Sequence, residues 1–311
     1  MRIIKKLWNL FKKDNNQESL RRTLIIECNS ACNVRCVWCS MQNFNKFNRG
    51  MMSVEEFRGI IERNKDYLKE QNYVVEPYFR GEPLIHPDFW EFCEILQQNE
   101  IPNGGINSNL SMEIDVNQFK KYNISILVNI GGVTKEVHER VMRHSNFELV
   151  TNNLRTLWSN GIPVMVKMNP TKKNYHQLQD LPKFVEKLGG RPSCILDYTT
   201  CSPIPYAMSE EETNIFFGDV VCDEIRDKLR FTYDESKRDK AIKTKVKSCD
   251  FQFDTILFNG QFTMCCHDQL GEINLGNAFV TPIKEIVESD AYRRVKEEGR
   301  NFRLKICKEC N

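Results

Sequence analysis

The sequence lacks a marked excess of charge of either sign. Its 311 residues carry 44 Lys and Arg against 42 Asp and Glu, which gives a formal net charge of +2. Proteins that bind nucleic acid through their surface field need a clear basic excess, so this balance argues against a nucleic-acid partner. The sequence also lacks the run of about eighteen apolar residues that a membrane-spanning helix needs. We therefore expect no membrane span.

A signal for export is also missing. Residues 1–16 are basic and apolar, but they have no long apolar stretch and no small-residue cleavage site. We therefore expect a cytoplasmic protein, in which thiols stay reduced. The same residues have the pattern of a basic amphipathic helix. Such a helix either packs against the rest of the protein, which is the simpler interpretation, or makes a peripheral contact with an anionic membrane surface.

Short apolar runs alternate with amphipathic segments from residue 24 to about residue 200. The predicted strands are Leu24–Glu27, Val74–Phe79, Gly105–Ser108, Ile124–Ile130, Pro163–Met168 and Cys194–Tyr198. Helices are predicted at Pro87–Gln98, Phe147–Asn160 and Tyr175–Leu188, and from a capping box at Ser53-Val-Glu-Glu56. This alternation predicts an α/β fold with a parallel sheet, either open or curled into a partial barrel.

The alternation ends near residue 205, which divides the chain. The expected units are a basic amphipathic segment (1–22), a core domain (23–205), a connector (206–248) and a small domain (249–311). The connector is expected to be helical from Ser209 to about Leu229 and charged after that. The small domain has two β-like runs around Asn259-Gly260, a helix near Ile283–Lys296 and little apolar content. We therefore expect a metal to stabilise it.

Cysteine, by contrast, is abundant, with thirteen residues. Without an export signal, so many thiols are more typical of metal sites than of disulfides. Cys32, Cys36 and Cys39 follow the first predicted strand with the spacing C-x3-C-x2-C. Three thiolates on a 4Fe–4S cluster leave one iron open for another ligand. The alternatives are a zinc site, which takes four ligands and commonly uses C-x2-C pairs, and buried structural thiols.

This motif, with Trp38 before its third cysteine, resembles the signature of the radical S-adenosylmethionine (SAM) superfamily. Arg80-Gly81-Glu82-Pro83 resembles that family's G-G-E-P motif, with Arg80 in place of the first glycine. Ser108-Asn109 resembles the first two residues of the family's T-N-G motif, with Leu110 in place of glycine. These motifs lie at the ends of successive predicted strands, and their order strengthens the resemblance.

The resemblance covers about residues 24–200 and implies a (β/α)6 partial barrel that binds a 4Fe–4S cluster and SAM. It also implies cleavage of SAM to a 5′-deoxyadenosyl radical, which removes a hydrogen atom from an unactivated C–H bond. Asn129 takes the place of a polar residue that faces the SAM ribose, and Arg143 matches an arginine near the SAM carboxylate. The residues that the resemblance implies for SAM binding are Trp38, Gly81, Glu82, Pro83, Ser108, Asn109, Asn129 and Arg143. We expect an electron donor of the flavodoxin or ferredoxin type.

A second cysteine set lies near the end of the chain. It consists of Cys249, Cys265, Cys307 and Cys310. Four thiolates suit either zinc or a 4Fe–4S cluster. The spacing from Cys249 through Gly260 to Cys265 resembles the opening of the SPASM/twitch domain, which implies an auxiliary 4Fe–4S cluster. Because the chain ends one residue after Cys310, we expect the shorter, twitch-type version with a single auxiliary cluster, and Cys266 as a core thiol rather than the ligand.

The remaining cysteines are expected to be core thiols, with one exception. Cys201 follows the last predicted strand, where a thiol could return a hydrogen atom to a substrate radical. We expect an oxidoreductase that acts on a small hydroxylated molecule such as a sugar or aminocyclitol, with the auxiliary cluster as electron acceptor. The alternatives are a peptide-modifying enzyme, an epimerase that uses a thiol such as Cys201, and a non-catalytic iron–sulfur carrier.

Overall fold

The computed structural model describes residues 21–39, 41, 48–169, 171–195, 253–265 and 268–309. The strands are β1 (Arg22–Ile26), β2 (Arg35–Cys36), β3 (Tyr73–Glu76), β4 (Ile106–Ser108), β5 (Ile126–Ile130), β6 (Met142–Arg143), β7 (Val164–Met168), β8 (Asp254–Ile256) and β9 (Phe262–Thr263). The α-helices are α3 (Val54–Glu70), α4 (Phe89–Gln98), α5 (Val116–Lys121), α6 (Lys135–Val141), α7 (Phe147–Ser159), α8 (Leu181–Lys187), α12 (Ile283–Val287) and α13 (Asp290–Arg300). Short 3-10 helices are η1 (Pro83–Ile85), η2 (Tyr175–Asp180), η3 (Pro192–Cys194) and η5 (Lys305–Glu309).

Three predicted segments lie outside these residues: the N-terminal amphipathic helix, the helix from Ser209 and the charged connector. Within the ranges given above, no helix has the length and apolar character needed to cross a bilayer.

Parallel strands form the centre of the fold. β1 pairs in parallel with β3, and β4, β5 and β7 form a second parallel run in that order. A parallel bridge between Val75 and Asn103 links β3 to the segment that leads into β4. Of the predicted strand Cys194–Tyr198, the structure describes Cys194 and Ile195. Cys194 ends the 3-10 helix η3, so the predicted start of the strand is wrong there, and Ile195 forms a parallel bridge with Val166. The strands follow one another across the sheet in chain order, as consecutive βα units require.

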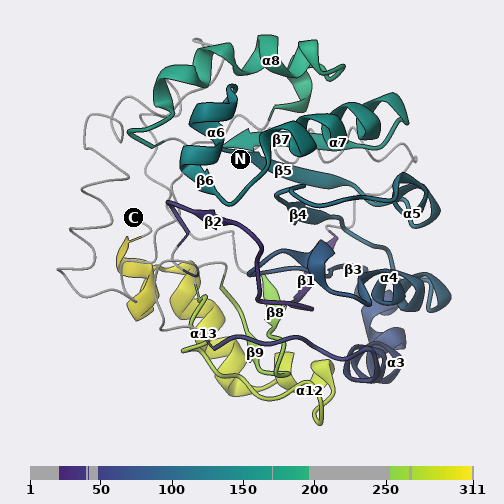
Figure 1. Ribbon diagram of the computed structural model, residues 1–311. Helices are drawn as coiled ribbons and strands as arrows, with labels where there is room; N and C mark the ends of the chain where they lie inside the picture. The colour runs from purple at the N-terminus through teal and green to yellow at the C-terminus, as the bar shows by residue number, and fades with distance from the viewer. Residues whose placement is uncertain are drawn as a thin grey trace.

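Helices cover the outer side of these strands, and α3, α4, α5, α7 and α8 succeed one another around it (Figure 1). α3 begins at the predicted capping box, which is confirmed. The Glu56 backbone N–H donates to the Ser53 hydroxyl at 3.2 Å, and the Ser53 backbone N–H donates to the Glu56 carboxylate at 2.8 Å. The two bonds satisfy donors that the first turn of a helix otherwise leaves unpaired.

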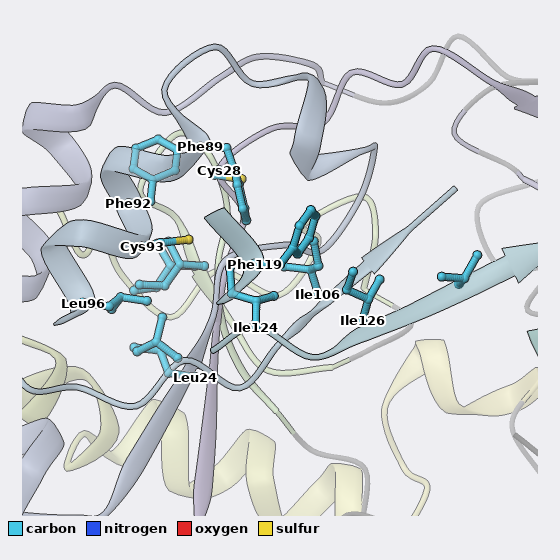
Figure 2. Packing of buried hydrophobic residues seen from close by; sticks show 14 of the residues in the cluster. Leu24, Cys28, Phe89, Phe92, Cys93, Leu96, Ile106, Phe119, Ile124 and Ile126 are labelled. Carbon is cyan, nitrogen blue, oxygen red and sulfur yellow. The ribbon is translucent and has the colours of Figure 1, made fainter. Parts of the chain in front are cut away.

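The main core lies between the strands and these helices. Figure 2 shows Cys28 and Cys93 among the apolar side chains of this core. Both thiols are buried, and the Cys28 thiol donates to the carbonyl of Pro77 at 3.0 Å. The prediction that these two cysteines are core residues is therefore confirmed.

The C-terminal segment extends the sheet of the barrel. β8 pairs in parallel with β1 and antiparallel with β9. The Asp254 carboxylate accepts hydrogen bonds from the hydroxyls of Tyr73 at 2.5 Å and Tyr292 at 2.6 Å. At the start of α12, the Ile283 N–H donates to the Asn64 side chain of α3 at 2.7 Å. The segment predicted as a second unit is thus fixed to the first strands and the first helix of the barrel.

Two predicted helices are divided in the structure. Tyr175–Leu188 begins as η2 and continues as α8, where Pro182 lies in the first turn and needs no N–H partner. Ile283–Lys296 is interrupted at Ser289, whose hydroxyl accepts from the Tyr292 N–H at 3.1 Å and caps α13. In both cases a residue suited to the start of a helix lies inside the predicted range.

Candidate metal centre and ligand site

The first cysteine set lies on the loop that follows β1, at the carboxyl edge of the sheet. Cys36 belongs to β2, which pairs antiparallel with β6. All three thiols are half-buried and pack against an apolar shell. The shell consists of Val34, Trp38, Val137, Val141 and Met142. Burial raises the pKa of the Cys36 thiol well above its ordinary value, and the neighbouring Cys39 and Cys32 raise it further.

This arrangement suits a cluster better than a single ion. Among the residues that the structure describes, no three His, Cys, Asp or Glu side chains are arranged to hold one metal ion. The protein ligands of a 4Fe–4S cluster bind different irons, so their sulfurs lie further apart than those around one zinc ion. The raised thiol pKa means that the negative charge of a thiolate is unfavourable in this apolar shell unless a positive charge lies beside it, and bound iron supplies that positive charge. The donor set therefore fits the cubane, and Trp38 forms part of its apolar backing.

The predicted R-G-E-P motif forms a turn packed on the cysteine loop. Gly81 has a φ of +74°, and a Cβ atom there would lie 2.4 Å from the carbonyl oxygen of Ala31, so the position requires glycine. The Glu82 N–H donates to the same carbonyl at 2.8 Å, and the Asn29 amide donates to the Glu82 carbonyl at 2.8 Å. The turn therefore fixes the residue directly before Cys32.

The Glu82 side chain connects this turn to the end of β4. Its carboxylate accepts from the Ser108 hydroxyl at 2.9 Å, the Asn109 N–H at 2.7 Å and the Leu84 N–H at 3.2 Å. Burial raises the Glu82 pKa to about 7, against the effect of these bonds. Pro83 starts η1, where its missing N–H is not needed. Glu82 is thus a positioning residue, and its predicted role in SAM binding remains a prediction.

The predicted Ser108-Asn109 motif reaches the first cysteine. The Asn109 amide lies 3.7 Å from the Cys32 sulfur and donates to the Asn33 side chain at 2.9 Å. Leu110, which stands where the family has glycine, has a φ of +51°. The turn therefore keeps the left-handed conformation that glycine favours, with a leucine in it.

Polar side chains lie on the inner face of the next strands. In β5, the core residues alternate with Leu127 and Asn129, which are half-buried on the opposite face. The side-chain oxygen of Asn129 is buried and has no hydrogen-bond partner among the residues that the structure describes, and the same holds for Asn107 of β4. Lys167 lies directly opposite Asn129 on β7. The sequence prediction named Asn129 alone, although a polar residue in an apolar strand marks the other two as well.

Arg143 lies next to the cysteine loop. It belongs to β6, opposite Arg35, and its Nε donates to the Arg35 carbonyl at 3.1 Å. Its charge lowers the pKa of Cys36, against the larger effect of burial. The structure thus brings the predicted cation beside the predicted cluster ligands, and its contact with the SAM carboxylate remains a prediction.

The second cysteine set is described in part. Cys265 follows β9, and the buried Cys307 lies in η5, whereas Cys249, Cys266, Cys310 and the predicted hydrogen donor Cys201 lie outside the described residues. Gly260 forms the tight turn between β8 and β9, with a φ of +82°. A Cβ atom there would lie 2.5 Å from the Asn277 side chain, which explains the glycine in this motif. The choice between Cys265 and Cys266 as ligand stays a prediction.

The sequence reasoning missed a buried ion pair that joins the two cysteine regions. Arg80 donates to both carboxylate oxygens of Glu27, at 2.5 and 2.6 Å, and both side chains are almost fully buried. Arg80 also donates to the carbonyl of Gln269 at 2.6 Å, and the Phe258 N–H donates to Glu27 at 3.1 Å. Glu27 and Arg80 are 53 residues apart, so no local pattern signals the pair.

Comparisons with known families identify two domains in the chain. Residues 26–188 match the radical SAM superfamily, and residues 249–311 match SPASM, an iron–sulfur cluster-binding domain. The mycofactocin maturase MftC of Mycobacterium tuberculosis is 23% identical over 168 residues, which cover 52% of this chain and 41% of that protein. The chain therefore matches less than half the length of this relative.

Solved structures show the same fold. BtrN in complex with AdoMet and 2-DOIA has a TM-score of 0.59 and 14% identity, with 94% of each chain covered. Native anSMEcpe with bound AdoMet and the Cp18Cys peptide has a TM-score of 0.67 and 15% identity. That match covers 90% of this chain and 83% of the other. Likeness at these identities concerns the fold, and it agrees with the predicted partial barrel and C-terminal iron–sulfur domain.

Proposed function

The chain belongs to the radical SAM superfamily, and we propose that it is an oxidoreductase that oxidises a C–OH carbon of a small substrate, such as a sugar or an aminocyclitol. Cys32, Cys36 and Cys39 hold a 4Fe–4S cluster with one iron open for SAM. A single auxiliary 4Fe–4S cluster is held by Cys249, Cys265, Cys307 and Cys310. Electrons come from a donor of the flavodoxin or ferredoxin type.

When bound, the reduced cluster and SAM supply a 5′-deoxyadenosyl radical, which abstracts a hydrogen atom from the substrate. The chain's own residues orient these partners. The Gly81 turn and Asn109 fix the loop around Cys32, and the unpaired oxygen of Asn129 can accept a hydrogen bond from a ligand hydroxyl such as those of the SAM ribose. The apolar shell behind the half-buried thiols limits their contact with water.

The bond from Arg80 to Gln269 carries the oxidative part of the proposal. Gln269 lies four residues after Cys265, and Arg80 directly precedes Gly81 of the turn that contacts the cysteine loop. Gln269, four residues after the proposed auxiliary-cluster ligand Cys265, is thus bonded to the edge of the barrel where SAM is expected. After hydrogen abstraction, oxidation of a C–OH carbon requires the loss of one more electron and of the hydroxyl proton, and a fully ligated cluster at this edge suits the role of electron acceptor.

Anaerobic turnover with candidate substrates tests this proposal. We expect a product lighter than the substrate by the mass of H2, with one SAM consumed per turnover and full activity in Cys201→Ala. Cys307→Ala should block product but still permit SAM cleavage. A product of unchanged mass that gains one deuterium in deuterium oxide, with the gain lost in Cys201→Ala, contradicts oxidation and indicates epimerisation.

A peptide substrate is the second candidate. It is supported by the likeness to a protein named a maturase and to a structure that holds the Cp18Cys peptide. In this case the same residues hold the same cofactors, and the mass change appears on a peptide. The non-catalytic carrier is disfavoured, because a carrier has no need of an open iron or of the turns that surround Cys32.

A further inference from the structure

Three neighbouring strands present polar side chains to the interior of the barrel. The apolar residues of β4, β5 and β7 belong to the core under the helices, so the alternate residues face inward. Asn107, Asn129 and Lys167 are such residues. Asn129 and Lys167 are register partners, which places their Cβ atoms about 5 Å apart. Both lie next to last in their strands, near the carboxyl edge where barrels of this type bind ligands.

The charge of Lys167 is uncompensated by the residues that the structure describes. No carboxylate of those residues pairs with its ammonium, and the side chain is half-buried. Burial alone lowers its pKa, to about 8, with no acidic neighbour among them to raise it. At neutral pH the charged ammonium form of Lys167 therefore still predominates. A charged group inside a protein is normally paired, so the missing anion points to a ligand.

A second observation points the same way. The carbonyl oxygens of the Asn107 and Asn129 side chains are buried and have no partner within the described part of the chain, and buried polar atoms are rarely left so. Each can accept a hydrogen bond from a hydroxyl. Asn129 is the acceptor expected to face the SAM ribose, which leaves the Asn107 oxygen and the Lys167 ammonium for the substrate. This pair is complementary to a molecule that carries both an acidic group and hydroxyl groups.

The loops beyond β5 and β7 hold this surface in place. The Asn174 amide donates to the carbonyls of Gly131 at 2.9 Å and Asn169 at 3.0 Å, so it joins the ends of the two strands. Gln177 accepts from the Val133 N–H at 2.8 Å. Asn129 and Lys167 are therefore held in a fixed relation to each other before a ligand binds, which reduces the entropy lost on binding.

We propose that Lys167 binds a phosphate or carboxylate group of the substrate, with Asn107 on its hydroxyl side. The substrate is then a hydroxylated molecule with an acidic group, such as a sugar phosphate or a sugar acid. This inference rests on the proposed function for the reaction, but the anion site stands on the barrel interior alone. SAM also has a carboxylate. Arg143, beside Cys36, is the cation assigned to that group, which leaves Lys167 for the substrate.

Competitive amine labelling tests the site without knowledge of the substrate. The anaerobically reconstituted full chain is treated with a trace of acetic anhydride, and acetylation is measured for each lysine by peptide mass spectrometry. Inorganic phosphate at about 10 mM, roughly ten times a Kd of 1 mM, should slow acetylation of Lys167 about tenfold. The exposed Lys183 of α8 is the matched control and should react at an unchanged rate.

Acetate and SAM are the other arms of the experiment. Acetate should also protect Lys167, less strongly than phosphate because it carries one charge. If SAM alone protects Lys167 and phosphate adds nothing, the lysine binds the SAM carboxylate and the proposal is wrong. Equal rates for Lys167 with and without phosphate also overturn it, as does a Lys167 that fails to react in the free protein. Failure of the proposed function has a different signature, because it is seen in the turnover product, which would keep the substrate's mass and gain one deuterium in deuterium oxide, whatever the labelling shows.

Discussion

Removal of Arg80 should destabilise the protein far more than removal of an exposed partner in an ion pair. Arg80→Met leaves the Glu27 carboxylate buried with the Phe258 N–H as its remaining donor among the bonds described. Removing one partner of a buried pair typically costs about 3–5 kcal/mol, because the other charge stays uncompensated. It also breaks the bond to Gln269, so the loop after Cys265 should lose its anchor on the barrel.

The assay is anaerobic thermal unfolding of the reconstituted protein. At about 2 °C per kcal/mol, the expected loss is a Tm decrease of about 6–10 °C. Lys135→Met is the control, because its bond to Glu148 at 3.0 Å joins two exposed side chains and is worth less than about 1 kcal/mol. Glu27→Gln should cost about as much as Arg80→Met, since it leaves the guanidinium unpaired.

The double variant completes the test. Glu27→Gln combined with Arg80→Met removes both charges, so it should cost clearly less than the sum of the two single changes. A Tm for Arg80→Met within about 2 °C of that for Lys135→Met contradicts the reasoning. So does a double variant whose loss equals the sum, because the two charges would then act independently.

Other substitutions test the turns and the interior. Gly81→Ala should weaken SAM binding, measured by titration, and lower the Tm, both more than Gly161→Ala does. Both glycines have a φ of +74°, but only at Gly81 would a new Cβ atom meet the backbone of another segment. Leu110→Gly should relieve about 1–2 kcal/mol of strain but lose about 2–5 kcal/mol of packing, so a rise in Tm would contradict this balance. Burial lowers the His138 pKa to about 4, so as the pH falls the unfolded state takes up a proton before the folded state does. Between pH 7 and pH 5 this group should therefore lower the free energy of unfolding by about 2 kcal/mol. If the free energy of unfolding of His138→Asn fell with pH as steeply as that of the wild type, this prediction would be refuted.

Much of the fold is predictable from local pattern. The alternation of apolar residues in Ile124–Ile130 and Pro163–Met168 placed β5 and β7 within two residues of their observed bounds. The Ser53 capping box marked the start of α3. The helix boundaries that failed were those at Pro182 and Ser289, where a start signal was overlooked inside an apolar pattern.

In the candidate site, too, local patterns were predictable from the sequence and contacts between distant segments were not. Spacing identified the cysteine loop, and the family resemblance identified the Gly81 turn and Asn109, which the structure brings together around Cys32. Contacts between distant segments had no sequence signal. Arg80 appeared as an irregular residue in a motif, and only the fold shows that it pairs with Glu27 and reaches Gln269. Lys167 was visible as a charge in an apolar strand, but the lack of a counter-ion among the described residues is a property of the folded interior.

The central claim is that Cys32, Cys36 and Cys39 hold an open-iron cluster that cleaves SAM. Its most direct test is the formation of 5′-deoxyadenosine from SAM by the anaerobically reconstituted, reduced protein, measured together with its iron content. The wild-type chain should form 5′-deoxyadenosine and hold about eight irons, and Cys36→Ala should form none. Cys194→Ala, a half-buried thiol outside both sets, should match the wild type. Formation of 5′-deoxyadenosine by Cys36→Ala at the wild-type rate would contradict the account.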